Sequence, residues 1–489
     1  MRKLRISGKN RILLAVSSLT FIGSLFLLGF RDYPHKPNVV LITIDCLRKD
    51  HLGYSGYPRN TTPQIDKIAS ESTVFTNAFT VATWTLPSMY SIATSTYPQV
   101  HGVMEVGDEF DTELITIFDV LNSYGYTSGF FSNSGLFDSY FSELKSLDYF
   151  LDNPKLKAHH LTKRVKEWIQ RRDNPFFIWI HYFDLHPPYT PPPRFRNLFM
   201  KDPYFQEKVI PVEKMACIYR HIFLDDPEAG EANIGEIVAN YDAELRFADE
   251  QVGELIEYLK SSSENRYIII ISADHGESLG ERTGNFFKFG HGNAEEEVVS
   301  IPLLIQAEGI LKKGKVIDSY VRSIDILPTV LDILRINYDE KAFQGRSLFP
   351  LMREERWEKI PYLFSTNTAG IDFIRTEKWK LIHLDRERLY RYLLRMRSDI
   401  FSPSELVNMT KEMFRTMEKQ NLFLDGNYVL INLENEHIVK DLSTEGYTQV
   451  YRDLKNRLDE WRQIGREKSH RKEIPEALRK RLKSLGYMQ

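Results

Sequence analysis

The sequence predicts an α/β fold in which a mixed or parallel β-sheet is sandwiched by helices. A continuous apolar and β-branched run from Asn38 to Asp45 predicts a central parallel strand. Similar runs recur at 176–181, 267–272 and 302–305. Helical patterns lie between or beside these runs, at 112–123, 161–171 and 237–260. Strands that alternate with helices predict one sheet with helices on both of its faces.

The pattern changes after about residue 355. Ile374 to His383 is typical of a β-hairpin, and Tyr428 to Leu433 of a further strand. A polar helical segment, 386–420, separates them, and a basic helical tail begins at Tyr451. The tail is interpreted as a solvated helix face, with docking on an anionic membrane as the alternative. We therefore predict a smaller α+β subdomain at 356–489, after a catalytic domain at 37–355.

The amino terminus has the features of a membrane anchor. Residues 12–30 carry no charge, and this length just reaches what a helix needs to cross a bilayer. Five basic residues precede the run and few follow it. We therefore predict that 1–36 is a cytoplasmic basic stub and a transmembrane signal anchor, with the rest of the chain on the extracytoplasmic side. A cleaved signal peptide is the alternative.

Composition excludes several classes of protein. The chain has 489 residues, and 64 Lys and Arg residues nearly balance 67 Asp and Glu residues. A net charge of −3 provides no basic field, so we expect no nucleic-acid partner. Two cysteines, Cys46 and Cys217, are too few for a disulfide framework or a structural zinc site built from cysteines.

Polar residues of the kinds that bind metal follow two of the predicted strands. Asp45 ends the first strand, and Asp274 and His275 follow the third, just before a glycine that permits a sharp turn. His291 stands between two more glycines. Two carboxylates and an imidazole suit one divalent cation, such as Ca²⁺, Mn²⁺, Mg²⁺ or Zn²⁺. A helix cap is the alternative role for a strand-end aspartate.

Thr85 precedes Leu86-Pro87, which predicts a helix that starts just after the threonine. A hydroxyl at a helix amino terminus meets a positive dipole, which would stabilise its alkoxide and an incoming anion. A metal ion on that oxygen would lower its pKa further. From this segment alone, the alternative is that Thr85 is only an N-cap.

Together these segments resemble the sulfatase family of the alkaline phosphatase superfamily, in family order from about Asn38 to Leu351. The segments that carry the resemblance are 38–54, 61–66, 83–102, 181–189, 241–244, 273–277, 290–292 and 323–329. The resemblance implies an alkaline-phosphatase-like mixed sheet. It also implies a set of roles: Asp45, Thr85, Asp274 and His275 at the metal, Thr85 as nucleophile, and His186, His291 and Asn133 at the substrate. His101, His181 and Asp184 are interpreted as structural.

The chain also departs from the usual sulfatase pattern. The family nucleophile is a cysteine or serine in a Cys-x-Pro-x-Arg frame that is oxidised to formylglycine. Thr85 and Met89 provide neither the oxidisable residue nor the arginine. Cys46 stands where the family has a second aspartate. These departures resemble the threonine-nucleophile branch, which includes membrane-anchored phosphoethanolamine and phosphoglycerol transferases.

We therefore predict an enzyme: a metal-dependent hydrolase or transferase that cleaves a sulfate or phosphate ester through Thr85. The departures favour phosphoryl transfer. Two alternatives are a hydrolase of sulfate esters on extracellular glycans that works without formylglycine, and an inactive membrane-tethered binding protein. The expected partner is an anionic ester, carried on a glycan, a lipid or a small molecule.

Overall fold

The computed structural model describes residues 36–172, 175–204, 208–211, 231–261, 266–280, 289–397, 402–443 and 446–464. The predicted membrane anchor at 12–30 lies outside these residues. Within the described ranges, no helix combines the length and the apolar character needed to cross a membrane.

The core is a mixed eight-stranded sheet with the order β12-β2-β11-β8-β1-β5-β3-β4. Its strands are β1 (Asn38–Ile44), β2 (Thr73–Phe79), β3 (Thr127–Ser132), β4 (Tyr149–Asp152), β5 (Phe176–Tyr182), β8 (Tyr267–Ala273), β11 (Ser300–Ala307) and β12 (Lys315–Arg322). As predicted, β1 is central, parallel to both neighbours, and buried along its whole length. β11 makes the sheet mixed, because it runs antiparallel to β8 and β2.

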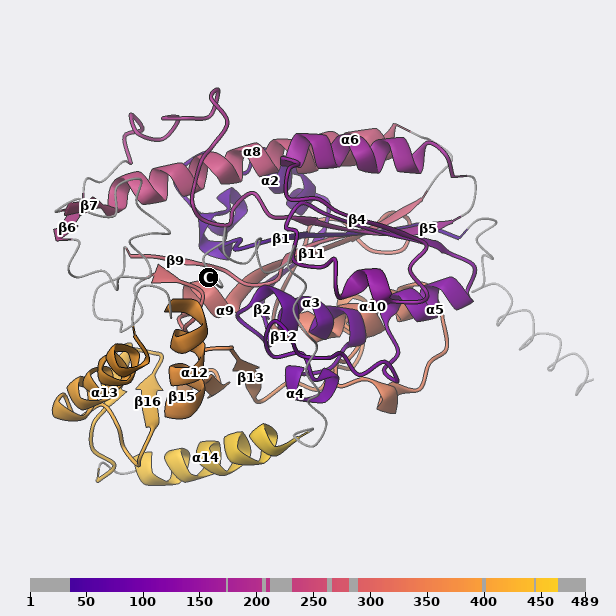
Figure 1. Ribbon diagram of the computed structural model, residues 1–489. Helices are drawn as coiled ribbons and strands as arrows, with labels where there is room; N and C mark the ends of the chain where they lie inside the picture. The colour runs from indigo at the N-terminus through magenta and orange to yellow at the C-terminus, as the bar shows by residue number, and fades with distance from the viewer. Residues whose placement is uncertain are drawn as a thin grey trace, which may run out of the picture. The chain divides into compact units, whose positions relative to one another are not determined.

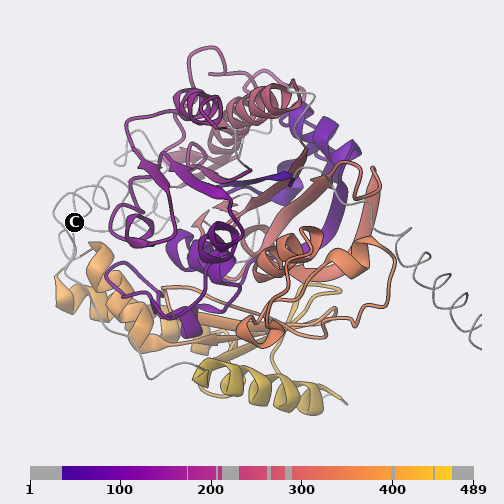
Figure 2. The same ribbon diagram turned by 90° about the vertical axis from the view of Figure 1, so that its right-hand side faces the viewer.

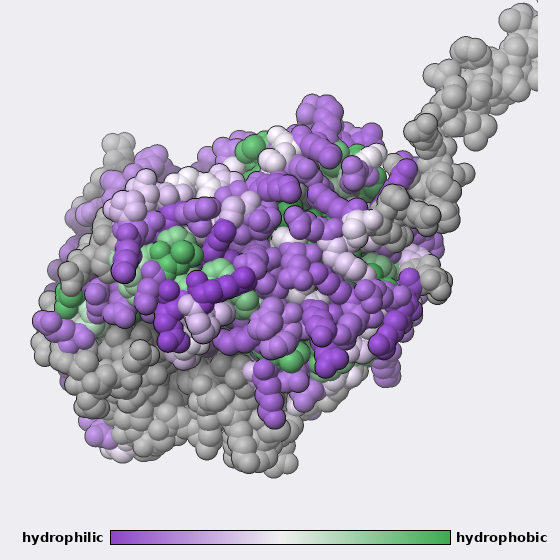
Figure 3. Space-filling model, turned by 90° about the horizontal axis from the view of Figure 1, so that it is seen from above, coloured by the Kyte–Doolittle hydropathy of each residue, from purple (hydrophilic) through white to green (hydrophobic). Residues whose placement is uncertain are grey.

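Helices cover both faces of this sheet, as the alternating pattern predicts. On one face lie α2 (Pro63–Ser70), α6 (Ala158–Ile169) and α8 (Ile234–Lys260); on the other lie α3 (Thr85–Thr94), α5 (Ile117–Ser123) and α10 (Ile326–Ile333) (Figure 1). α6 and α8 are amphipathic and bury their apolar residues against the sheet. Their side of the molecule is mostly hydrophilic on its surface (Figure 3).

Helix starts differ slightly from the sequence prediction. α5 begins at Ile117 and not at residue 112, because Thr116 and Asp119 form a capping box. α6 and α8 begin three residues earlier than predicted. Short elements complete the catalytic part: α4 (Pro98–His101), α9 (Glu296–Val299), α11 (Phe349–Met352), β6 (Val209–Pro211), β7 (Glu231–Asn233), β9 (Ser278–Leu279) and β10 (Phe289–Gly290).

A second, antiparallel sheet follows the first along the chain. Its order is β13-β14-β15-β16-β17, formed by Leu363–Thr366, Ile371–Arg375, Trp379–Leu384, Tyr428–Asn432 and His437–Val439. The predicted hairpin is β14 and β15, and the predicted last strand is β16. Between them lie α12 (Arg386–Arg397) and α13 (Pro403–Lys419), and the tail forms α14 (Tyr447–Gln463). Figure 2 shows these elements gathered on one side of the molecule.

The small sheet is tied to the catalytic part by two cations that share one partly buried carboxylate. Lys380 on β15 donates to Glu296 at 2.7 Å and also to the carbonyl of Ala294. Arg375 on β14 reaches the same carboxylate at 3.1 Å. Although burial opposes it, these two cations hold the pKa of Glu296 down at about 2. The loop that carries His291 is therefore anchored by the small sheet.

Candidate active site

Asp45 and Asp274 are neighbours because two parallel strands end in register. Ile44 at the end of β1 pairs with Ala273 at the end of β8, and each aspartate is the next residue. Both carboxylates are fully buried. Burial and the charge of Asp274 raise the pKa of Asp45 well above its usual value. Two buried carboxylates so close together call for a compensating positive charge.

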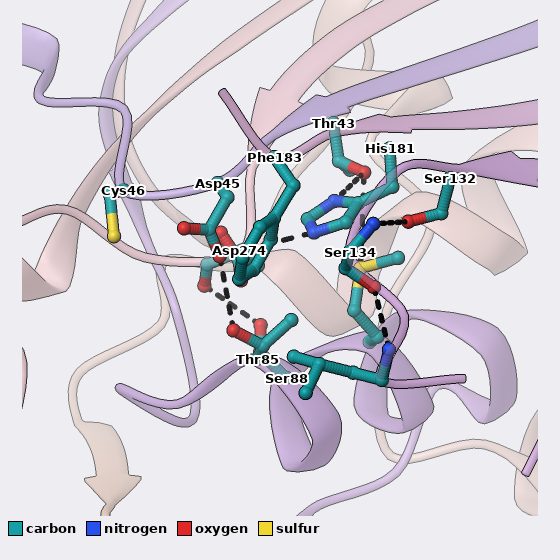
Figure 4. A network of polar contacts seen from close by, with 12 residues as sticks. Thr43, Asp45, Cys46, Thr85, Ser88, Ser132, Ser134, His181, Phe183 and Asp274 are labelled. Atoms are coloured by element: carbon teal, nitrogen blue, oxygen red, sulfur yellow. Dashed lines mark hydrogen bonds and ion pairs between the residues drawn. The ribbon is translucent and has the colours of Figure 1, made fainter. Parts of the chain in front are cut away.

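The Thr85 side chain points at this pair and does not cap its own helix (Figure 4). α3 begins at Thr85, one residue earlier than expected, with Trp84 at the N-cap. Thr85 Oγ1 donates to Asp45 Oδ1 at 3.0 Å and lies 3.4 Å from His275 Nε2. One turn later, Ser88 Oγ donates to the carbonyl of Asp274 at 2.8 Å, which fixes the helix against β8. The N-cap reading of Thr85 is therefore wrong.

His275 is oriented by its neighbours. Its Nδ1 lies 3.0 Å from the carbonyl of Gly276, so the hydrogen belongs on Nδ1 and the Nε2 lone pair faces Thr85. Burial lowers the pKa of His275, which favours this neutral form. Gly276 is required here, because a Cβ at this position would lie 1.9 Å from the backbone oxygen of Glu297.

These side chains fit a divalent cation. Donor atoms of Asp45, Asp274 and His275 lie within 4.8 Å of one another, and all three residues are buried. One oxygen of each carboxylate, Asp45 Oδ2 and Asp274 Oδ2, has no hydrogen-bond partner among the described residues. Buried oxygens without partners are costly unless something positive meets them. The predicted ligand set is thus brought together, while the identity of the ion stays open.

His186 and His291 lie beside the same cluster. The His291 ring stacks on His275, with centroids 4.3 Å apart, and lies 5.8 Å from the His186 ring. His186 stacks on Phe183, and its Nδ1 lies 2.7 Å from the carbonyl of Pro187. The two predicted substrate histidines therefore meet beside the predicted nucleophile.

Asn133 is placed differently from the expected substrate contact. Its amide donates to Asp184 at 2.7 Å and to the carbonyl of Leu156, and its oxygen accepts from the backbone of Phe183. Asp184 in turn accepts from the N–H of Ala158 at the start of α6. The Asn133 amide is engaged in a brace between loops, and its role at the substrate stays a prediction.

His101 has a structural role, as predicted. It hydrogen-bonds Ser91, and burial lowers its pKa to about 3. His181 is more involved than the sequence indicates. Its Nδ1 lies 2.9 Å from Thr43, and its Nε2 lies 3.9 Å from Asp45 Oδ1 (Figure 4). Its place on β5, beside β1, is the signal that could have identified it.

Sequence reasoning missed Glu277 and the orientation of Cys46. Glu277 is fully buried, and its Oε2 lies 3.1 Å from both Cys46 Sγ and His291 Nδ1. The signal available was its place three residues after Asp274, in the segment that carries two predicted ligands. Cys46, at the position of the family's second aspartate, is fully buried.

Comparison with known protein families decides the relationship. The model of the family described as Sulfatase matches residues 37–336. The chain belongs to the sulfatase family. A second model, described as N-sulphoglucosamine sulphohydrolase, C-terminal, matches residues 284–423. The family prediction is confirmed, and with it the prediction of an enzyme that acts on ester bonds.

Individual relatives are distant in sequence. The chain is 26% identical to an ulvan-active sulfatase of Formosa agariphila over 357 residues, which is 66% of each chain. A solved sulfatase-fold structure in complex with its substrate D-glucosamine-2-N,6-O-disulfate superposes with a TM-score of 0.67 at 18% identity, over 88% of this chain and 100% of that one. A phosphonate monoester hydrolase from Silicibacter pomeroyi gives 0.60 at 18% identity, over 78% and 96%. At these identities the structures show a shared fold.

Proposed function

We propose that this sulfatase-family enzyme is a metal-dependent hydrolase of sulfate esters on sugars, with Thr85 as its nucleophile. The observation that carries the proposal is the contact of Thr85 Oγ1 with Asp45 at 3.0 Å and with His275 at 3.4 Å. The substrate class is supported by the relatives, whose names refer to ulvan and to a disulfated glucosamine. These relatives favour sulfate esters over the phosphoryl transfer that the sequence pattern favours.

Asp45, Asp274 and His275 would hold the cation. A divalent cation there would supply positive charge beside the Thr85 hydroxyl and beside the anionic ester. Thr85 also stands at the amino terminus of α3, where the helix dipole favours negative charge. The Asp45 carboxylate, which accepts the Thr85 hydrogen bond, is placed to take the hydroxyl proton.

The proposed reaction has two steps, formation and hydrolysis of a covalent intermediate. The Thr85 oxygen forms a bond to sulfur while the bond from sulfur to the sugar oxygen breaks, which leaves a threonyl sulfate and a sugar alcohol. We assign the proton on the departing sugar oxygen to His186. The contact of its Nδ1 with the carbonyl of Pro187 fixes the ring, so Nε2 is the nitrogen we assign to proton transfer. Water then attacks the threonyl sulfate and releases inorganic sulfate, and Thr85 recovers its proton.

His291 is assigned to a non-bridging oxygen of the sulfate group. It stacks on His275, and Glu277 fixes its Nδ1 at 3.1 Å. A donor fixed in this way stabilises the charge that develops on the transferred group without reorganising during the reaction.

The test is a substrate panel with the purified chain. We expect release of inorganic sulfate from D-glucosamine-2-N,6-O-disulfate or from an aryl sulfate, abolished by EDTA and restored by added divalent cation. Thr85→Ala should abolish turnover while the far-UV circular dichroism spectrum stays unchanged. Sulfate release by Thr85→Ala at the wild-type rate would exclude Thr85 as the nucleophile.

Transfer or hydrolysis of phosphate esters is the second candidate. Threonine in place of the usual cysteine or serine, with Met89 in place of the arginine, favours it. The same panel therefore includes bis-p-nitrophenyl phosphate and p-nitrophenyl phosphate. Activity confined to these compounds would replace the sulfatase proposal.

We also propose that residues 12–30 anchor the chain in a membrane. Carbonate extraction of membranes from expressing cells tests this, because an anchored chain stays in the pellet.

A further inference from the structure

A second cluster of donor atoms lies beside the proposed catalytic cation. Cys46 Sγ, Glu277 Oε2 and His291 Nδ1 form a triangle with edges of 3.1 Å from sulfur to oxygen, 3.1 Å from nitrogen to oxygen and 3.7 Å from sulfur to nitrogen. All three residues are buried. Donor atoms of Cys46, His275 and His291 also lie within 4.8 Å of one another. No step of the proposed reaction uses Cys46 or the Glu277 carboxylate as a reactant.

The triangle has the size of one face of a zinc tetrahedron. Bonds of about 2.3 Å to sulfur and about 2.0–2.2 Å to nitrogen and oxygen place tetrahedral donors about 3.3–3.6 Å apart. An ion would enter this triangle with shifts of about half an ångström or less. The other oxygen of Glu277, Oε1, is buried and has no hydrogen-bond partner within the part of the chain that the structure describes. Leaving a buried carboxylate oxygen without a partner costs free energy, and a cation beside it would offset that cost.

We propose that Cys46, Glu277 and His291 form a second cation site, which binds Zn²⁺ or another thiophilic divalent ion next to the catalytic cation. Thiolate sulfur is a soft ligand that selects zinc over calcium or magnesium, whereas the Asp45 and Asp274 carboxylates suit either class. Binding releases the thiol proton to solvent and places the His291 hydrogen on Nε2. Three protein donors leave the fourth position of a tetrahedral ion open.

The cluster differs from the catalytic cation site in its donors. Asp45 precedes Cys46 in sequence, yet the Cys46 side chain lies on the side of Asp45 away from His181 (Figure 4). The ring stack of His275 on His291 joins the two sites at 4.3 Å between centroids. Coordination by Nδ1 keeps the assigned role of His291, because the hydrogen on Nε2 can still be donated to a sulfate oxygen. Zinc binding here does not depend on the proposed function.

A metal-free arrangement is the competing account. In it the Cys46 thiol donates to Glu277, and His291 donates to the same carboxylate oxygen. Burial, followed by the charge of Asp45, raises the pKa of the thiol well above its usual value, so without an ion it stays protonated. The two accounts differ in whether a thiolate-to-metal bond forms when a thiophilic ion is offered.

The experiment replaces bound metal with Co²⁺ in the full chain and records the absorption spectrum. A cobalt–thiolate bond gives a charge-transfer band in the near ultraviolet, and tetrahedral Co²⁺ gives strong visible bands. We expect the charge-transfer band in the wild type and its absence in Cys46→Ser, whose visible bands would come only from Co²⁺ at the Asp45, Asp274 and His275 site. Cys217→Ser is the matched control, because Cys46 and Cys217 are the only cysteines of the chain. It should keep the full band.

Metal analysis separates the two sites. After dialysis against excess Zn²⁺, Cys46→Ser and Glu277→Gln should each lose one equivalent of zinc relative to the wild type. Asp274→Asn should keep the cobalt–thiolate band, because Asp274 belongs to the other site. Circular dichroism of each variant establishes that it is folded. The absence of the band in the wild type, or its persistence in folded Cys46→Ser, would overturn the proposal whether or not the enzyme hydrolyses sulfate esters.

Discussion

Replacing Thr85 with valine tests the nucleophile with the least change of shape. Valine is β-branched like threonine and of similar size, so the start of α3 keeps its packing while the hydroxyl is lost. Thr85 is only 1% exposed, and its Oγ1 contacts Asp45 and His275. The change therefore removes one oxygen from the centre of the site and leaves the other side chains of the site in place.

The magnitudes follow from these contacts. Loss of a nucleophile from a covalent mechanism should lower kcat about 10⁴-fold or more. The lost hydrogen bond ends on a carboxylate, and such bonds contribute roughly 1.5–3 kcal/mol. The buried methyl group offsets part of this, which leaves a loss of about 1–2 kcal/mol. For a domain of this size, the melting temperature should fall by about 1–3 °C.

The assay pairs sulfate release with calorimetry and with mass spectrometry of acid-quenched reactions. Wild-type enzyme should yield a sulfated peptide that contains Thr85, and Thr85→Val should not. Thr85→Ser keeps the oxygen and should retain measurable turnover. Ser88→Ala is the matched control one turn later on α3: it loses a hydrogen bond to a carbonyl at 2.8 Å and should stay within about tenfold of wild-type activity. A Thr85→Val enzyme with wild-type kcat would refute the reasoning.

Three further predictions concern buried groups. Burial raises the pKa of Glu244 from 4.5 to about 8, so the folded protein holds this proton more tightly and loses stability as pH rises between these values. A change of one pKa unit corresponds to about 1.4 kcal/mol, so Glu244→Gln should be more stable than the wild type by up to roughly 4 kcal/mol at pH 8. At pH 4.5 the two proteins should differ little. Urea unfolding measures both values, and parallel dependence of stability on pH in the two proteins would contradict this. Gly276→Ala should lower kcat about 100-fold or more in steady-state assays. The new Cβ would lie 1.9 Å from the Glu297 carbonyl oxygen, and the shift that relieves this contact would displace His275. A near-normal kcat would contradict this prediction. Lys380→Met removes one of the two cations that contact Glu296, at 2.7 Å, and leaves Arg375 as the other. It should cost about 1.5–3 kcal/mol in thermal unfolding, and an unchanged melting temperature would contradict this.

Much of the catalytic part is predictable from local patterns. The run at 38–45 identifies β1, because a strand buried on both faces is apolar throughout. Leu86-Pro87 locates the start of α3 to within one residue. The pairing of Asp45 with Asp274 follows once both are recognised as the residues after parallel strands.

Other features depend on packing that no local pattern shows. β11 lies between β8 and β2 and runs antiparallel to both. An apolar run predicts a buried strand but does not indicate whether that strand is parallel or antiparallel to its neighbours. The orientation of Cys46 requires a residue in the left-handed region, at φ 55°, which sequence does not indicate for cysteine. A role for Asn133 at the substrate is predicted from the family resemblance, whereas its amide donates to Asp184, which is distant in sequence.

The clasp of Lys380 and Arg375 on Glu296 has a consequence for the order in which the enzyme becomes active during synthesis. Ribosomes deliver Asp45, Thr85, Asp274 and His291 well before β14 and β15. Until that hairpin emerges, the Glu296 carboxylate has neither cation, and the loop with His291 lacks its anchor. We therefore expect a nascent chain that already contains every proposed catalytic residue to be inactive. Activity should begin only when the small sheet has folded and contacts Glu296 of α9.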